Sequence, residues 1–196
     1  MKDIKTKIGS FFGLLAAMSG LCFFLIKEDQ SDYLKLLVFS KTEGFRHSSI
    51  EEGKKMLQNI ADQNGFEVLF SEEAEVFNER VLADINVIVF LNTTGDILDD
   101  TQQLELQRYI QAGGGFVGIH SATDTEYKWP YYNQLVGAYF ESHPDPAEAT
   151  IEVINRDHLS TCHLSQNWVH TDEWYNFRAM HPDIHVLMEV NKAHYQ

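Results

Sequence analysis

Short apolar runs alternate with longer amphipathic segments through the middle of the chain. The apolar runs have the length of strands and cover residues 34–39, 66–70, 85–91 and 116–119. The segments between them carry apolar residues at roughly helical spacing and are predicted as helices, at residues 48–64, 74–83 and 101–112. This alternation indicates βαβ units, so we predict an α/β fold with a doubly wound, mainly parallel, flavodoxin-like sheet.

Two of these predicted helices have recognisable features. Ser48 and Glu51 have the spacing of a capping box, and Gly65 is placed to end the same helix. In the helix at residues 101–112, Leu104 and Ile110 are predicted to face the core, and three glycines follow it directly.

Beyond His120 the pattern becomes irregular. Residues 151–154 and 184–188 are predicted as two further strands. Three connecting segments are rich in aromatic, carboxylate and imidazole groups and are predicted as loops, at residues 128–132, 141–146 and 170–177. Long connections of this composition in a compact domain are usually functional.

Sheets of this class bind ligands beyond the carboxyl ends of their strands. Three predicted loops lie at that edge, at residues 40–47, 92–96 and 120–124. The last of them follows the strand at residues 116–119, and the junction of strand and loop reads Gly-Ile-His-Ser-Ala at residues 118–122. This is the pattern of a nucleophile elbow, a tight strand-to-helix turn that exposes one side chain. We therefore predict that His120 is presented at this edge.

The residue at this turn excludes one reaction. In glutamine amidotransferases of this fold the exposed residue is a cysteine, and an imidazole cannot replace a thiolate in that acyl-transfer cycle. The two cysteines, Cys22 and Cys162, lie far from the turn in sequence. Ser121 lies one position beyond the exposed residue, which disfavours a serine hydrolase.

Imidazole and carboxylate groups gather in the loops beyond the strands. Their convergence suits a divalent metal ion, zinc or a similar one, or general acid–base catalysis. The predicted catalytic residues are His120, Asp172 and Glu173. The predicted metal ligands are His47, His120 and His143. For each single histidine the alternative is an ordinary surface or hydrogen-bonded loop residue.

Aromatic residues concentrate in the same half of the chain. Aromatic faces beside carboxylates commonly hold sugar rings, because ring CH groups stack on them while the carboxylates bind hydroxyls. We predict a substrate-binding set, which comprises His47, Asp124, Trp129, His143 and Trp174. The alternative is that the tryptophans cover the edge of the sheet as part of the core.

Composition narrows the range of partners. The chain of 196 residues has 29 acidic and 15 basic side chains, a net charge of −14, which argues against a nucleic-acid partner. Its length and its 44% of hydrophobic residues suit one domain with a substantial core. We therefore expect a small-molecule ligand, a carbohydrate, and no nucleic acid.

The N-terminal segment has the pattern of an export signal. Lys2, Lys5 and Lys7 precede an uncharged stretch at residues 8–26. We predict either a cleaved signal peptide or an uncleaved membrane anchor at residues 1–30. The domain at residues 31–196 would then be exported, periplasmic or anchored facing outward, and would meet the membrane only through this segment. A buried N-terminal helix is the alternative.

Four motifs, in order, resemble the ThuA-like, or trehalose-utilisation, family. They lie at residues 44–47 (GFRH), 114–124 (GGFVGIHSATD), 137–144 (GAYFESHP) and 171–175 (TDEWY). The resemblance implies the class I glutamine amidotransferase-like fold without its catalytic cysteine. It also implies a role in carbohydrate utilisation, with disaccharides and their 3-keto derivatives as ligands. By this resemblance the pocket is lined by His47, His120, Asp124, His143, Asp172 and Glu173.

Family members usually continue beyond the position of Val190 with further glycine-rich and His-Pro segments. This sequence ends at Gln196. We therefore expect either a truncated sequence, which we favour, or a domain that has lost its C-terminal strands; the second would leave a buried strand with an unprotected edge.

Two classes of function follow from these residues. The first is proton-transfer chemistry on a keto-sugar, an isomerisation, elimination or hydrolysis, with His120 and a nearby carboxylate as acid and base. A divalent ion that polarises the ketone would assist it. The second is a carbohydrate-binding module without turnover, which needs only the aromatic rings. A structural domain tethered to the membrane is favoured only if no sugar binds.

Overall fold

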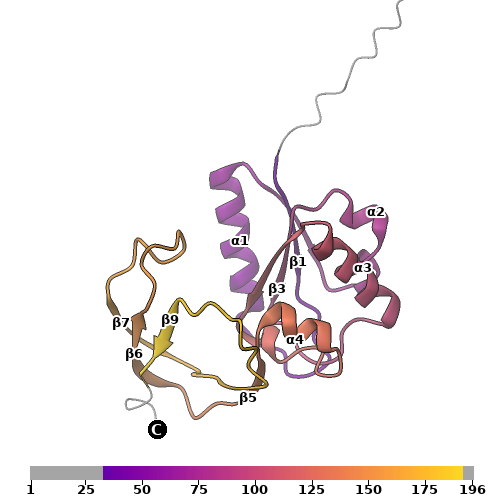
Figure 1. Ribbon diagram of the computed structural model, residues 1–196. Coiled ribbons are helices and arrows are strands. Elements are labelled where there is room, and N and C mark those ends of the chain that lie inside the picture. The colour runs from indigo at the N-terminus through magenta and orange to yellow at the C-terminus, as the bar shows by residue number, and fades with distance from the viewer. Residues whose placement is uncertain (1–32, 192–196) are drawn as a thin grey trace, which may run out of the picture. The chain divides into compact units, whose positions relative to one another are not determined.

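A parallel sheet forms the centre of the molecule, as predicted. The computed structural model describes residues 33–191. Strands β1 (Lys35–Phe39), β2 (Glu67–Ser71), β3 (Val87–Leu91) and β4 (Gly115–Ile119) pair in the order β2-β1-β3-β4, all parallel (Figure 1). Because β2 and β3 flank β1 on opposite sides, the order reverses between β1 and β3, the place where such sheets bind ligands.

Helices cover both faces of this sheet (Figure 1). The main helices are α1 (Ile50–Asn64), α2 (Glu79–Leu82), α3 (Asp100–Gln111) and α4 (Pro130–Val136). Two short 3₁₀ helices are η1 (Ala74–Val76) and η2 (His120–Thr123). The single helix predicted at residues 74–83 is therefore two short ones, because the Asn78 side chain accepts a hydrogen bond from Val81 N–H and caps α2.

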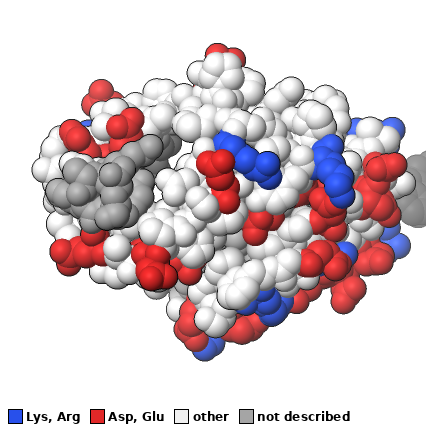
Figure 2. Space-filling model, turned by 90° about the horizontal axis from the view of Figure 1, so that it is seen from below, with Lys and Arg blue, Asp and Glu red and all other residues white. Residues whose placement is uncertain are grey.

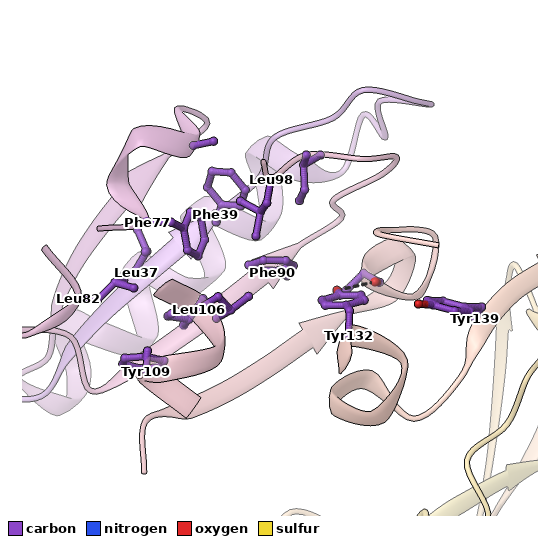
Figure 3. Packing of buried hydrophobic residues seen from close by; sticks show 14 residues of the cluster. Leu37, Phe39, Phe77, Leu82, Phe90, Leu98, Leu106, Tyr109, Tyr132 and Tyr139 are labelled. Atoms are coloured by element: carbon purple, nitrogen blue, oxygen red, sulfur yellow. Dashed lines mark hydrogen bonds between the residues drawn. The ribbon is translucent and has the colours of Figure 1, made fainter. Parts of the chain in front are cut away.

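Alternate residues of the central strands pack on opposite faces of the sheet, as the period of a β-strand requires. Leu37 of β1 and Phe90 of β3 belong to the cluster that includes α3 and α4 residues (Figure 3). Their neighbours Val38 and Leu91 pack instead with Leu57 of α1. The sheet is thus doubly wound, and both clusters exclude water from its centre.

The predicted start of α1 is wrong in detail, and its predicted end is right. The capping box of Ser48 and Glu51 does not form, because α1 begins at Ile50 and its first turn has no side-chain cap. The neighbouring Ser49 hydroxyl instead accepts a hydrogen bond from Asn92 Nδ2, at 2.9 Å. The end of the helix is as predicted, since Gly65 adopts the left-handed conformation that glycine favours, with φ 70°.

Of the two residues of α3 predicted to face the core, Ile110 packs against the main cluster as predicted, and Leu104 is on the wrong face. Leu104 is 44% exposed, and the buried residues of this helix are Leu106 and Tyr109. The helix starts with a capping box of Asp99 and Gln102. Leu106 and Tyr109 are three residues apart, so they share a face of the helix that Leu104 does not.

The second half of the chain forms antiparallel sheets. Strand β5 (Tyr139–Ser142) pairs with β8 (Asn176–Arg178). Strand β6 (Ala147–Val153) lies between β7 (Asn167–Asp172) and β9 (Met188–Val190).

The loop predicted at residues 170–177 is therefore partly strand. Every residue of β7 is exposed, so its sequence lacks the alternation of apolar and polar residues that marks a half-buried strand. The predicted strand at 184–188 is a strand only from Met188 onward.

The predicted signal or anchor at residues 1–30 lies outside the described residues. Among the helices of residues 33–191, none is long and apolar enough to cross a membrane.

Candidate functional site

The turn after β4 has the predicted geometry. The strand ends at Ile119, and the 3₁₀ helix η2 starts directly at His120. His120 has a φ of 51°, in the left-handed region that residues other than glycine rarely adopt. A Cβ atom at Gly118 would lie only 3.1 Å from Ala122 Cβ, so small residues on either side allow the tight turn. The fold thus presents an imidazole at the carboxyl edge of the sheet.

The loop after β1 brings His47 to the same edge. It is held by the fully buried Thr94, whose carbonyl accepts a hydrogen bond from Glu43 N–H at 2.8 Å. The Thr94 hydroxyl also donates to the Phe45 carbonyl at 3.0 Å and accepts from Gly44 N–H at 3.2 Å. The backbone of residues 43–45 is therefore fixed just before His47.

An ion pair holds the other side of this loop. Two guanidinium nitrogens of Arg46 bind the two carboxylate oxygens of Glu72, each at 2.9 Å, and Lys54 Nζ adds a contact of 2.8 Å. Hydrogen bonds from Arg46 and then Lys54 lower the pKa of Glu72 to about 2. Since Arg46 directly precedes His47, this pair restrains the position of the imidazole.

His47, His120 and Glu173 converge at this edge. His120 Nε2 lies 3.3 Å from Glu173 Oε2, and His47 Nε2 lies 3.9 Å from the same oxygen. The two imidazole rings meet edge to face, with centroids 4.7 Å apart. One donor atom from each of the three side chains lies within 4.8 Å of the others, close enough to share a metal ion. Two imidazole nitrogens and one carboxylate oxygen are a chemically suitable donor set for a divalent transition metal.

The neutral state of the His47 imidazole favours metal binding by these three side chains. Burial lowers its pKa, and the neighbouring His120 lowers it further, while the Glu173 and Asp124 carboxylates oppose the shift. His47 is therefore neutral at neutral pH, the form in which an imidazole binds a metal or accepts a proton. Its Nδ1 is 3.3 Å from the Ser121 hydroxyl, which leaves Nε2 facing Glu173.

Ser121, His47 and Glu173 lie in the order of a hydrolase triad, but the serine is not accessible. The Ser121 residue is fully buried, with 0% exposure. A substrate carbonyl cannot reach its hydroxyl, so this contact orients His47 and does not provide a nucleophile. The serine hydrolase disfavoured on sequence grounds is also disfavoured by geometry.

Tyr175 is part of the site and was not among the predicted site residues. Its hydroxyl lies 3.0 Å from His120 Nε2, and its ring contacts the His120 ring at a centroid distance of 4.5 Å. Burial raises the pKa of Tyr175, and the carboxylates of Glu173, Asp124 and Asp172 raise it further. The sequence shows Tyr175 only as one aromatic residue among several beside the acidic motif.

The remaining predicted residues lie around this cluster at varying distances. Asp124 accepts a hydrogen bond from the Tyr127 hydroxyl, and Asp172 accepts one from Glu173 N–H at 2.8 Å. His143 is exposed, and its ring stacks on Tyr175 with centroids 5.6 Å apart. It is not part of the group of donor atoms that the described residues bring together.

The two predicted sugar-binding tryptophans pack in hydrophobic clusters. Trp174 is 8% exposed and packs with Ala149 and Ile151, and its indole N–H donates to the Ala147 carbonyl at 2.6 Å. Trp129 packs against the main core and stacks on Tyr132. The alternative interpretation, in which these rings belong to the core, fits their positions.

Fold and site together define a class of protein: a doubly wound α/β domain whose strand-to-helix turn presents an imidazole to a second imidazole and a carboxylate. A family model described as ThuA, trehalose utilisation, matches residues 35–196. The chain belongs to this family, which confirms the resemblance seen in its motifs and indicates a function related to trehalose utilisation.

Solved structures support the same fold. A ThuA-like protein from Bacteroides uniformis ATCC 8492 is 22% identical with a TM-score of 0.70, and the match covers 81% of this chain and 68% of that one. A ThuA-like protein from Parabacteroides merdae ATCC 43184 is 18% identical with a TM-score of 0.68, over the same shares of the two chains. Comparison with curated proteins gave no match.

Proposed function

We propose that this protein is a carbohydrate-modifying enzyme that acts on a disaccharide or its 3-keto derivative, with His47, His120 and Glu173 at the reaction centre. The observation that supports a reaction most directly is the convergence of two imidazoles on Glu173 Oε2, at 3.3 and 3.9 Å. The left-handed conformation of His120 is a second support, since backbone strain at non-glycine residues is concentrated at functional sites. A carbohydrate-binding module would not need this arrangement.

The proposed chemistry is proton transfer beside a ketone. A carbon next to a carbonyl group carries a removable proton, which a positioned carboxylate or imidazole can accept without any covalent intermediate. In the absence of a cation, Glu173 is the nearest base to His120, and His120 is the acid that returns the proton. An isomerisation and an elimination both begin with such a step, and the net result is a hydrolysis when water then adds to the elimination product.

The same centre is proposed to bind a divalent cation through His47, His120 and Glu173. When bound, such a cation polarises a carbonyl oxygen and makes the neighbouring proton easier to remove. Asp172 is outside this donor set and adjoins Glu173, so it remains available as the base. The Ser121 contact holds His47 with Nε2 toward the other donors, as partners of metal-binding histidines commonly do.

The surface charge is compatible with a neutral substrate and a cation. Acidic side chains outnumber basic ones on the face shown in Figure 2, in line with the net charge of −14. A negative surface attracts cations and repels polyanions. This supports a sugar without phosphate groups and opposes a nucleic acid.

The test is turnover of a small panel by the full chain. Trehalose, 3-keto-trehalose and the 3-keto derivative of a second disaccharide are each incubated with protein stripped of metal and with protein supplied with zinc, and products are followed by NMR. We expect conversion of a keto-disaccharide, faster with zinc. Binding of these sugars without any product would favour the carbohydrate-binding module, and no binding would contradict both.

We also propose that the domain is exported through its N-terminal segment. The support is the basic start at Lys2, Lys5 and Lys7 followed by the uncharged stretch at residues 8–26. The full chain expressed in a Gram-negative host is expected in the periplasmic or membrane fraction, where N-terminal sequencing distinguishes a cleaved signal from an anchor. Recovery of the intact chain from the cytoplasm alone would contradict export.

A further inference from the structure

The hydroxyl of Tyr175 contacts one of the three proposed metal-binding side chains, His120. It lies 3.0 Å from His120 Nε2, the nitrogen that is itself 3.3 Å from Glu173 Oε2. Tyr175 follows Glu173 by two positions, with the buried Trp174 between them. Glu173 and Tyr175, on either side of Trp174, therefore both contact His120 Nε2.

The spacing of these atoms suits ligands of one ion. Metal bonds to nitrogen and oxygen are about 2.0–2.2 Å long, so two ligands at a right angle lie about 3.0 Å apart and two at a tetrahedral angle about 3.4 Å apart. The contacts of His120 Nε2 with Tyr175 and Glu173, at 3.0 and 3.3 Å, fall at these separations. His47 Nε2, at 3.9 Å from Glu173 Oε2, needs only a small movement to join them.

The Tyr175 ring is held in this orientation by its neighbours. It contacts Phe140 at a centroid distance of 4.3 Å and stacks on His143 at 5.6 Å. On the chain before it, the Trp174 indole is fixed by its hydrogen bond to Ala147 O. On the chain after it, β8 pairs with β5. These contacts restrain the Tyr175 side chain, so the fold fixes the position of its hydroxyl.

We propose that Tyr175 is a fourth ligand of the cation site, so that the site comprises His47 Nε2, His120 Nε2, Glu173 Oε2 and the Tyr175 phenol oxygen. This inference rests on the proposed cation site and extends it. On binding, the Tyr175 O–H bond breaks, its proton passes to solvent, and the oxygen lone pair forms the bond to the ion, with no change of oxidation state.

Copper(II) and zinc titrations of the full chain test the inference. A phenolate bound to copper(II) gives a visible charge-transfer band that imidazole and carboxylate ligands do not give. We expect this band at one equivalent of copper in the wild type and its loss in Tyr175→Phe, which keeps the ring and its packing. Zinc affinity of the variant is expected to fall by about 10-fold or more, the scale of loss when a site's supporting contacts are removed.

Tyr131→Phe is the matched control, because Tyr131 is a partly buried tyrosine of α4 whose ring contacts the ring of Trp129 at a centroid distance of 5.6 Å. It is expected to keep the band and the zinc affinity. A variant Tyr175→Phe with unchanged zinc affinity, or a wild type that binds copper without the band, would overturn the role of Tyr175 and leave the three-residue site standing. A wild type that binds neither ion would overturn the cation site as well, and leave acid–base catalysis by His120 and Glu173 to be judged by turnover.

Discussion

Replacing His120 with asparagine is expected to reduce turnover of the keto-disaccharide by about 100-fold or more, the usual scale for loss of a positioned acid–base group. His120 provides the atom that contacts both Glu173 and Tyr175. Asparagine is chosen because it tolerates the left-handed conformation at this position better than most residues, so the turn is retained. The rate with saturating substrate is compared with that of the wild type, and bound zinc is measured on the same samples.

His163→Ala is the control for this experiment, because His163 is exposed and no functional role is assigned to it. It should leave both turnover and bound zinc unchanged. Circular dichroism and the melting temperature must show that His120→Asn is folded. A folded His120→Asn protein with full turnover would remove His120 from the reaction, whatever its effect on zinc.

Replacing Phe90 with alanine is expected to lower the free energy of unfolding by about 3–5 kcal/mol, the range for removing a large buried aromatic ring. Phe90 has no exposed surface, and its ring contacts those of Phe39, Phe116 and Tyr132 at centroid distances of 5.2–5.8 Å. The cavity left behind cannot be filled easily, because these neighbours come from two other strands and a helix. Urea unfolding of the full chain measures the change.

Leu159→Ala provides the comparison for Phe90→Ala. Leu159 is 88% exposed, so its truncation should change the free energy of unfolding by less than about 0.5 kcal/mol. Equal losses in the two variants would contradict the packing described for the core. The result also bears on the site, since the Tyr132 that stacks on Phe90 donates a hydrogen bond of 2.7 Å to the Ala122 carbonyl, in the turn that carries His120.

The local sequence was sufficient to predict those parts of the structure that depend on a single strand or a single turn. The apolar runs predicted the four parallel strands, and most clearly β1 and β3, because a strand buried on both faces has no polar positions. The glycine at position 118 and the alanine at position 122 predicted the tight turn at His120, because only small residues fit there. In the antiparallel half, the exposed strand β7 has no such pattern, so the sequence did not distinguish it from a loop.

Interactions between distant segments decided the rest of the site. The sequence placed His47, His120 and Glu173 in one pocket only through the family resemblance, and it did not single out these three as the donors that meet. His47 follows β1 while Glu173 follows β7 in a different sheet, so their contact depends on the tertiary structure. The sequence likewise grouped Trp174 with ligand-binding aromatics, and the structure buries this ring against Ala149 and Ile151. Tyr175, its neighbour, contacts His120 instead. Trp174 joins the core and Tyr175 joins the site because the packed strands cover one side of this segment and leave the other side toward His120. The sequence of two adjacent aromatic residues does not determine which side is covered, since that depends on how the distant strands pack.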